Sequence, residues 1–305
     1  MKAKIEVLKA RLSHGVSPAL ATPLLDDGYT VNPAVVAQLA HFLMDAGVKG
    51  LFVGGTTGEG ILLEPGERMR LHQAAVEAAA VRVPAILHVG ANRLKDAVAL
   101  AAHAQSLGAD AIAAVTPYYY GMDDDGLAGY YAAVAAAAPD TPLLMYDIPH
   151  MAVNGVSPAL AARLSREIPS MAGMKSSQRD ANAVRALLDA TPADFILLAG
   201  NESVALGLLA LGVDGLISGL GTAIPEPYVA LTAAMAAGDL TTARKHQRLI
   251  NQLLALMPSG KRIGGIKTIL AERGVPVGPA VPPRPMPAGA VWPPMEALLQ
   301  GAGLI

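Results

Sequence analysis

The stretch AIAAVTPYYYGMDDDGLAGYYAAVAAAAPDTPLLMY, residues 111–146, contains two short apolar runs separated by a longer alanine-rich segment. The runs Ala111–Val115 and Pro142–Tyr146 are continuously apolar rather than alternating, which is typical of parallel strands buried on both faces. The segment Leu127–Ala138 between them has room for the crossover helix that parallel strands usually require. The stretch therefore predicts a strand, a helix and a second, parallel strand.

The same alternation extends in both directions from this unit. Eight strand–helix units in roughly 235 residues match the usual size of a (β/α)₈ barrel, and we predict this α/β fold. The alternative, an open doubly wound sheet, requires a glycine-rich fingerprint after the first strand, where Ala21-Thr22-Pro23 stands. The predicted strands are Val16–Thr22, Gly50–Gly54, Pro84–His88, Ala111–Val115, Pro142–Tyr146, Met171–Lys175, Phe195–Ala199 and Gly215–Ser218. The helical patterns between them include Asn32–Ala46, Pro65–Ala80, Leu94–Leu107, Leu127–Ala138 and Asn182–Ala190.

Polar residues and glycines mark the expected helix ends. Three helices are expected to begin with caps, at Asn32, Asp125 and Ser157. Three are expected to end in glycine, at Gly47, Gly108 and Gly212.

Beyond about residue 237 the strand–helix alternation stops. The segments Asp239–Met257 and Lys261–Arg273 predict helices with no strand between them. The proline- and glycine-rich segment Val275–Pro294 follows, and then a short helix near Met295–Gln300. The proline segment is interpreted as a surface loop rather than as a ligand for a polyproline-binding domain. We therefore expect a (β/α)₈ barrel with a short N-terminal segment at residues 1–236 and a helical extension at residues 237–305.

Composition excludes several classes of protein. Of the 305 residues, 52% are hydrophobic and 16% are charged, which excludes wholesale disorder. The net charge of −2 and the absence of a Lys/Arg run give no reason to expect nucleic acid or a membrane as a partner. The chain has no cysteine, so disulfides, thiolate nucleophiles and iron–sulfur clusters are excluded. Residues 1–15 lack the uninterrupted apolar region of a secretory signal, and we expect a cytoplasmic protein.

Catalytic residues of such barrels lie at the carboxyl ends of the strands. The polar residues at the predicted strand ends are Thr22, Thr56, Thr57, Glu59, Thr116, Tyr118, Tyr119, Tyr120, Tyr146, Asp147, Lys175, Ser176, Ser177, Asn201 and Glu202. This set contains one lysine, Lys175, which follows the apolar residues Met171–Met174. A lysine inside a barrel loses solvation, which lowers its pKa and favours the neutral amine that attacks carbonyl groups to form imines. The alternative is a lysine that extends to water or forms a salt bridge.

Two further features at the strand ends have both a chemical and a structural interpretation. The turn Gly54–Gly60 offers backbone N–H groups beside two hydroxyls, which can hold a carboxylate or phosphate, although it is also explained as a plain tight turn. It is not a P-loop, because no lysine follows the second glycine at the required place. Tyrosines such as Tyr119 and Tyr146 can relay protons through a hydroxyl such as that of Thr56, or they can simply pack with the phenol in water.

The seven histidines show neither the H-E-x-x-H motif nor another metal-ligand spacing with a carboxylate, which disfavours a metal-dependent aldolase. A serine hydrolase is not expected, because the chain lacks G-x-S-x-G.

Taken together, the strand ends resemble those of the dihydrodipicolinate synthase / N-acetylneuraminate lyase family. The resemblance covers about residues 15–235, with family motifs in family order on the predicted strands, and the segment Gly264–Gly274 resembles the family's C-terminal region. The matching pieces are Gly55-Thr56-Thr57-Gly58-Glu59, Gly90-Ala91-Asn92, Thr116-Pro117-Tyr118-Tyr119, Tyr146-Asp147-Ile148-Pro149, Gly173-Met174-Lys175-Ser176-Ser177, Gly200-Asn201-Glu202 and Asp214-Gly215-Leu216-Ile217-Ser218.

The resemblance implies a class I aldolase that holds a 2-oxo acid, such as pyruvate, as a Schiff base on Lys175. Tyr146 would be the proton shuttle. Tyr119, reaching across a subunit interface, would join it and Thr56 in a proton relay. No metal or organic cofactor would be needed, because the imine itself withdraws electrons. The family resemblance also implies a homotetramer built as a dimer of tight dimers.

The resemblance assigns the substrate pocket as well. The turn at Gly55, Thr56 and Thr57 would bind the substrate carboxylate, and Gly200 and Ile217 would shape the pocket through their backbones. An aldehyde would be the second reaction partner. Residues with polar side chains that are candidates for contacting this second half of the substrate are His150, Asn154, Ser177 and Asn201.

The chain departs from the synthase branch of the family at several positions. Met151 stands where that branch has an arginine for the second substrate's carboxylate, and a thioether does not replace a bidentate guanidinium. Gly60 and Ile61 differ from the small polar pair of the lysine-feedback site, although Asn92 matches. Asp147 stands where asparagine is usual.

These departures favour a 2-keto-3-deoxy sugar-acid aldolase or dehydratase. The synthase is the alternative within the enzyme class. A non-catalytic barrel that binds 2-oxo acids is the alternative from another class, because a fold alone does not set function.

Overall fold

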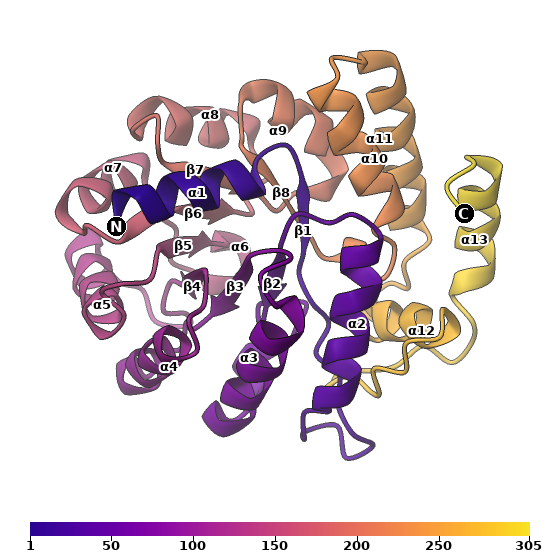
Figure 1. The fold of residues 1–305 in the computed structure, drawn as a ribbon, viewed down its shortest axis with the longest axis horizontal. Helices are drawn as coiled ribbons and strands as arrows, with labels where there is room; N and C mark the ends of the chain where they lie inside the picture. The colour runs from indigo at the N-terminus through magenta and orange to yellow at the C-terminus, as the bar shows by residue number, and fades with distance from the viewer.

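The computed structural model describes all residues 1–305 and contains one eight-stranded sheet in which neighbouring strands are parallel (Figure 1). The strand order β1-β8-β7-β6-β5-β4-β3-β2 follows the chain around a circle, and a parallel bridge between Ala19 and Phe52 joins its two ends. The predicted (β/α)₈ barrel is confirmed, and each strand overlaps a predicted one. The strands are β1 Val16–Pro18, β2 Leu51–Val53, β3 Ala85–His88, β4 Ala111–Val115, β5 Leu143–Asp147, β6 Met171–Ser176, β7 Ile196–Ala199 and β8 Gly215–Ser218.

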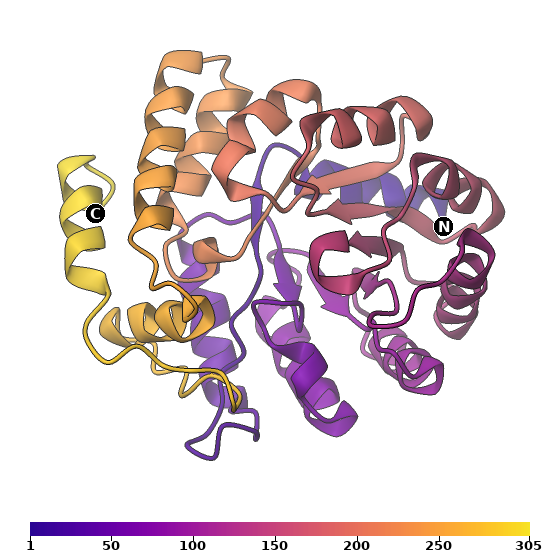
Figure 2. The same ribbon diagram turned by 180° about the vertical axis from the view of Figure 1, so that it is seen from behind.

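Helices surround the strands in both views of the molecule (Figures 1 and 2). Their apolar faces pack on the outer face of the sheet in one continuous hydrophobic core, so each strand is buried on both faces. The surrounding helices are α2 Pro33–Asp45, α3 Pro65–Ala79, α4 Leu94–Ser106, α5 Asp124–Ala137, α7 Pro158–Glu167, α8 Ala181–Ala190, α9 Ala205–Leu211 and α10 Glu226–Ala236. Short turns of helix follow the carboxyl ends of four strands: η1 Gly60–Leu62, α6 Pro149–Ala152, η2 Glu202–Val204 and η3 Leu220–Thr222.

A helix that the sequence analysis did not predict, α1 Lys2–Leu12, closes the amino end of the barrel. Its residues Leu8 and Leu12 belong to the hydrophobic cluster inside the barrel, together with side chains such as Phe52 and Ile196. Lys9 holds the helix in place, because its Nζ donates a hydrogen bond to the carbonyl oxygen of Ala193 at 2.8 Å, just before β7. The interior is thus filled from this end, and open space remains at the carboxyl ends of the strands.

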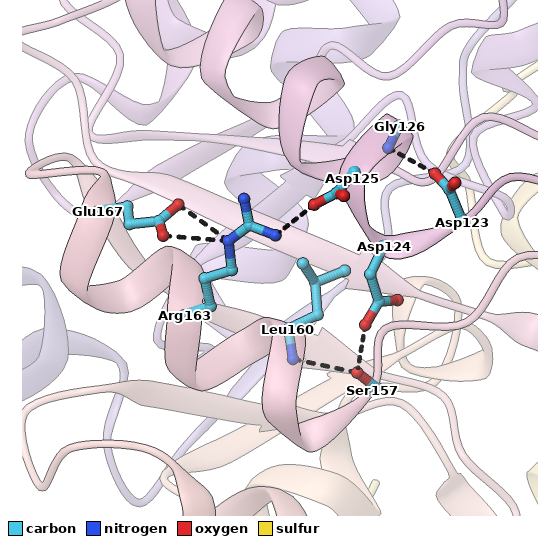
Figure 3. A network of polar contacts seen from close by, with 8 residues as sticks. All are labelled: Asp123, Asp124, Asp125, Gly126, Ser157, Leu160, Arg163 and Glu167. Atoms are coloured by element: carbon cyan, nitrogen blue, oxygen red, sulfur yellow. Dashed lines mark hydrogen bonds and ion pairs between the residues drawn. The ribbon is translucent and has the colours of Figure 1, made fainter.

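The helix caps agree only partly with expectation. Ser157 caps α7, since its Oγ accepts a hydrogen bond from Leu160 N at 3.0 Å (Figure 3). The prediction for α5 is wrong by two residues, because Asp123 is the cap and accepts from Gly126 N at 2.8 Å. Asp125 instead lies in the first turn and pairs with Arg163 of α7 at 2.6 Å, linking the two helices (Figure 3).

At α2, Asn32 makes no side-chain cap hydrogen bond, and the helix start is set by the proline at its first position. The three predicted terminal glycines, Gly47, Gly108 and Gly212, all have the positive φ of left-handed backbone.

Three helices follow the barrel: α11 Leu240–Ala255, α12 Arg262–Glu272 and α13 Trp292–Gly301, as expected without an intervening strand. α11 packs beside α10, and the segment after α12 returns to α2, where Gln38 Nε2 donates to the carbonyl oxygen of Gly274 at 2.9 Å (Figure 2). No helix of the structure has the combination of length and apolar sequence needed to cross a bilayer.

Candidate active site

A cavity of about 460 Å³ opens at the carboxyl ends of the strands. It brings together most of the side chains that the sequence analysis singled out. Those that line it are Thr56, Thr57, Tyr146, His150, Lys175, Ser177, Gly200, Asn201, Glu202 and Ile217. Gly55, Tyr119 and Asn154, which were also singled out, do not line it.

Lys175 lies on β6 directly opposite Tyr146 of β5 in the strand register, so both side chains point into the barrel. Lys175 is 4% exposed. Its Nζ lies 3.9 Å from the centre of the Tyr146 ring and 4.2 Å from that of Phe52. No carboxylate pairs with this amine, so the alternative of a salt-bridged or solvent-extended lysine does not describe it.

The space beside Lys175 exists because residue 200 has no side chain. A Cβ at Gly200 would lie 2.5 Å from Ser177 Oγ and 3.4 Å from Lys175 Cε. Ile217 of β8 is buried and forms part of the cavity wall. Both residues thus lie at the cavity wall, and their role in shaping a pyruvate pocket stays a prediction.

The turn after β2 places two threonines at the cavity. A side chain at Gly60 would overlap the carbonyl oxygen of Gly54, so the turn folds tightly back on itself. Thr22 Oγ1, four residues after β1, donates to the carbonyl oxygen of Gly58 at 2.5 Å and holds the turn from the segment that follows this strand. The backbone N–H groups of Thr56 and Thr57 donate to no acceptor within the chain, which leaves them free at the cavity wall.

Thr56 and Tyr146 are directly connected. Thr56 Oγ1 and the Tyr146 hydroxyl are 2.9 Å apart and share a hydrogen bond. Next to this pair lies a second cavity of about 90 Å³, whose walls include Thr56, Tyr146 and Met151.

Tyr119 does not join this pair within the chain. It is 76% exposed, stacks edge-on against Tyr120 with ring centres 5.0 Å apart, and lines neither cavity. Its φ of +80° lies in the left-handed region that residues with side chains rarely adopt. The loop therefore presents the Tyr119 ring outward, toward solvent or a second subunit.

His88 at the end of β3 is a site residue that the sequence analysis missed. Its Nδ1 lies 3.0 Å from the carbonyl oxygen of Gly54, and its Nε2 accepts from Val115 N at 3.2 Å, which fixes the neutral tautomer with hydrogen on Nδ1. Burial, followed by the charges of Arg68 and Lys175, holds the pKa of His88 well below its usual value. The ring packs edge-on against Tyr146, with centres 5.8 Å apart, and so joins the ends of three strands behind the phenol.

The signal for His88 was present in the sequence, because it is the last residue of the predicted strand Pro84–His88. It belonged in the set of polar strand-end residues by the same criterion as Lys175.

The candidates for contacts with the second half of the substrate fall into two groups. His150, Ser177 and Asn201 line the cavity, as expected. Asn154 does not, and this candidate was wrong. It is buried, and its side-chain amide donates to the carbonyl oxygens of Pro117 at 2.7 Å and Tyr120 at 2.8 Å. Asn154 thus shapes the tyrosine loop rather than the pocket.

Arginines at the cavity were also missed. Arg262 of α12 forms an ion pair with Glu202, and Arg284 reaches the cavity from the proline-rich segment that was interpreted as a surface loop. Proline content indicates that a segment is irregular but not which surface it covers.

No group of three or more histidine, aspartate or glutamate side chains comes together in a geometry that suits a metal ion.

Comparisons with known proteins agree on one family. The model of the dihydrodipicolinate synthetase family matches residues 12–288. An uncharacterised DapA-like lyase of Halobacterium salinarum is 37% identical over 266 residues, covering 87% of this chain and 86% of the relative. The 4-hydroxy-tetrahydrodipicolinate synthase of Salinibacter ruber is 36% identical over 245 residues, covering 80% of each protein. Among solved structures, a catalytic lysine mutant of the Ruminococcus gnavus sialic acid aldolase superposes with a TM-score of 0.89 at 30% identity, covering 97% of this chain and 96% of that one.

Proposed function

Because this chain belongs to the dihydrodipicolinate synthetase family, whose members are metal-independent lyases of the class I aldolase type, we propose that Lys175 holds a 2-oxo acid as a Schiff base. One observation carries the proposal. A buried amine without a carboxylate partner lies against the ring of a tyrosine whose hydroxyl is hydrogen-bonded to Thr56, in a cavity open to substrate.

The chemistry begins with attack of the neutral Lys175 amine on the C2 carbonyl of the 2-oxo acid. Loss of water leaves an iminium ion, which withdraws electrons from C3. In the cleavage direction, the C4 hydroxyl gives its proton to a base, the C3–C4 bond breaks and an aldehyde leaves. The resulting enamine takes up a proton at C3, and water then releases pyruvate and the free amine. In this proposal the Tyr146 hydroxyl carries these protons, and its hydrogen bond to Thr56 supports that role.

The substrate carboxylate has a binding place beside this amine. The two free N–H groups at Thr56 and Thr57 point to a site for a carboxylate, and the threonine hydroxyls add further donors. Gly55 contributes by letting the turn approach Phe52, because a Cβ there would lie 2.5 Å from the Phe52 ring. A 2-oxo acid anchored in this way presents its C2 carbonyl to Lys175.

The proton relay is completed by a second copy of the chain in this proposal. Tyr119 is exposed, and the cavity of about 90 Å³ beside Thr56 and Tyr146 is open to an entering side chain. A homo-oligomer with a two-fold interface would exchange this tyrosine between subunits. We therefore propose a dimer as the smallest active unit, and a tetramer as its assembled form.

The favoured reaction is cleavage or dehydration of a 2-keto-3-deoxy sugar acid. Met151 lines both cavities, where it offers a thioether and no hydrogen bonds to a carboxylate. His150, Ser177 and Asn201 offer donors and acceptors that suit hydroxyl groups. The second candidate is 4-hydroxy-tetrahydrodipicolinate synthase, which is favoured by the name of the Salinibacter ruber relative.

Trapping with sodium borohydride tests the Schiff base. The protein is incubated with pyruvate and borohydride, and its intact mass and peptide map are measured. We expect a covalent adduct on Lys175 and none in the Lys175→Met variant. Unchanged mass in the folded wild-type protein would overturn the proposal, and equal pyruvate binding by Lys175→Met would support a non-catalytic binding protein instead.

The role of Tyr146 is tested in the same preparation. The Tyr146→Phe variant should retain the trapped adduct on long incubation but lose turnover by about 10²–10⁴-fold, the usual contribution of a positioned acid or base. Screening aldehydes in the condensation direction then separates the two candidate reactions, because aspartate semialdehyde is the preferred partner only for the synthase.

A further inference from the structure

The larger cavity carries an excess of positive charge. Three arginines, Arg179, Arg262 and Arg284, line it beside Lys175, against the single carboxylate of Glu202. Glu202 forms an ion pair with Arg262, and its Oε1 also accepts hydrogen bonds from Ser218 Oγ at 2.7 Å and from Leu220 N at 2.8 Å. In the proposed reaction, Lys175 becomes the iminium ion, and the positive charge of that ion faces the carboxylate of the bound 2-oxo acid. Arg179 and Arg284 remain without an assigned function.

Arg284 is held at the cavity by a buried ionic cluster. The carboxylate of Glu59, which has no exposed side-chain surface, lies 3.2 Å from Lys267 Nζ and accepts from Val281 N at 3.0 Å. The Nε of Arg284 lies 3.6 Å from the same carboxylate, and its guanidinium makes no hydrogen bond in the structure. The Glu59 carboxylate therefore faces two cations, Lys267 and Arg284. The cluster keeps one excess positive charge, and Arg284 is the cation that reaches the cavity.

Arg179 contributes a further cation, one without a carboxylate partner, from the loop after β6. It is exposed, and no carboxylate lies within 4.0 Å of its guanidinium. The pKa of the neighbouring His150 is lowered, first by burial and then by the charge of Arg179. His150 thus adds no positive charge at neutral pH, and the arginines are the cations of this part of the cavity.

We propose that the site takes a substrate whose end remote from the 2-oxo group is anionic, a carboxylate or a phosphate, and that Arg284, assisted by Arg179, binds it. This inference rests on the proposed function. Arg284 lines the same two cavities as Met151, so a guanidinium from the proline-rich segment is available where residue 151 provides none. Planar guanidinium groups bind the paired oxygens of carboxylates and phosphates with two parallel hydrogen bonds.

Three aldehydes with a common reacting end test the proposal in the condensation direction with pyruvate. Tartronate semialdehyde, glyceraldehyde 3-phosphate and glyceraldehyde share the aldehyde and its hydroxyl neighbour but end in carboxylate, phosphate and hydroxyl, respectively. We expect kcat/KM for one of the two anionic aldehydes to exceed that for glyceraldehyde by on the order of ten- to a hundredfold, the effect of a hydrogen bond to a charged group. The better of the two identifies the anion.

The variants Arg284→Met and Arg179→Gln assign the binding groups. Arg284→Met should reduce the ratio of kcat/KM for the preferred anionic aldehyde over glyceraldehyde, mainly through KM for the aldehyde, and Arg284→Lys should restore part of it. Arg179 is exposed and unpaired, so Arg179→Gln removes charge without disturbing the ionic cluster around Glu59. Arg244→Met on the exposed face of α11 is the matched control and should keep the wild-type ratio.

The outcomes separate this inference from the proposed function. An adduct on Lys175 together with equal use of all three aldehydes would overturn the anionic-substrate inference alone. So would a wild-type ratio in both Arg284→Met and Arg179→Gln. Absence of the borohydride adduct would overturn the Schiff base itself, whatever the aldehyde preference.

Discussion

Asp147 and Tyr146 are neighbours on β5, and their side chains point to opposite faces of the sheet. Tyr146 faces the barrel, whereas Asp147 accepts hydrogen bonds from Val156 N at 3.0 Å and Gln178 Nε2 at 2.7 Å. The carboxylate thus fastens the loops that follow β5 and β6, which accounts for a side chain left unexplained by the sequence. Burial raises the pKa of Asp147 above its usual value, although these two hydrogen bonds oppose the shift.

The raised pKa predicts that Asp147→Asn stabilises the protein at neutral pH. The folded state binds the Asp147 proton more tightly than the unfolded state, whose pKa is 3.8. Stability is therefore lost as pH rises from about 3.8 through the higher pKa of the folded state, and it stays reduced above that. Asparagine cannot ionise and still offers an oxygen to Val156 N. We expect the difference in unfolding free energy between Asp147→Asn and wild type to grow between pH 4 and pH 7 in denaturant titrations.

The control for this prediction is Asp26→Asn in an exposed loop, because it removes a carboxylate that is exposed rather than buried. A difference that is flat with pH, or one that matches the Asp26→Asn series, would contradict the assignment to burial.

Single residues were predictable from the sequence when their position along a strand determined their surroundings. Lys175 is the only lysine at a predicted strand end, and a strand end inside a barrel is buried whatever the rest of the chain does. Arg284 was not predictable, because its place depends on how a proline-rich segment folds across the barrel. Asn154 was misassigned for a similar reason, since only the folded loop shows that its amide is already used.

The elements of the barrel followed from the sequence because parallel strands buried on both faces are continuously apolar. Helix α1 did not, because its segment KAKIEVLKARL has neither a side-chain cap nor an acidic residue in its first turn. Its position depends on Leu8 and Leu12, which pack inside the barrel against side chains from strands far along the chain. Contacts of that kind have no local signal.

The turn after β2 and the helix α12 are linked by the Glu59–Lys267 pair, both of whose side chains are fully buried. Lys267 Nζ also donates to the carbonyl oxygen of Pro279 at 2.5 Å, so the same cluster fixes the proline-rich segment. We propose that residues 237–305 form an extension of the barrel. The cluster of Glu59, Lys267 and Pro279 attaches this extension to the turn that is proposed to bind the substrate.

This link predicts a large destabilisation when one partner is removed. Lys267→Met leaves the buried Glu59 carboxylate with Arg284 as its remaining cation, and we expect a loss of about 3–5 kcal/mol of unfolding free energy. The double variant Glu59→Gln/Lys267→Met removes both charges and should recover part of that loss. Denaturant midpoints measure both values, with Lys245→Met on the exposed face of α11 as the control. Equal midpoints for Lys267→Met and Lys245→Met would show that the pair does not support the fold.

In the whole molecule, the loop around Tyr119 presents large side chains on the surface. Tyr119 and Tyr120 are each 76% exposed, and Met122 follows them at 40%. A backbone held at positive φ by a residue with a side chain costs energy, and such strain is concentrated where it serves function. The arrangement predicts that the subunits associate through this loop and that each one supplies Tyr119 to its partner's site.

Complementation between two impaired variants tests this exchange. Lys175→Ala lacks the amine, and Tyr119→Phe lacks the relay hydroxyl. In a two-fold dimer containing one chain of each kind, the site with Lys175 receives Tyr119 from the Lys175→Ala chain and is complete. Random reassembly of an equal mixture makes half of the dimers mixed, with one complete site in two, so about a quarter of wild-type activity should return.

The expected recovery of activity depends on which chain supplies Tyr119 to a site, not on the folding stability of the variants. The result therefore distinguishes exchange between subunits from action within one chain. Each variant is unfolded and refolded alone, then both together, and activity is measured at equal total protein. If Tyr119 acted within its own chain, a mixed dimer would contain one site without the amine and one without the phenol, and activity would stay at the mean of the two variants. The control is a chain that carries both substitutions, Lys175→Ala and Tyr119→Phe, refolded together with wild type. It offers neither group, so its mixed dimers pair an intact lysine with a phenylalanine at position 119, and activity per wild-type chain should fall as the double variant is added in excess.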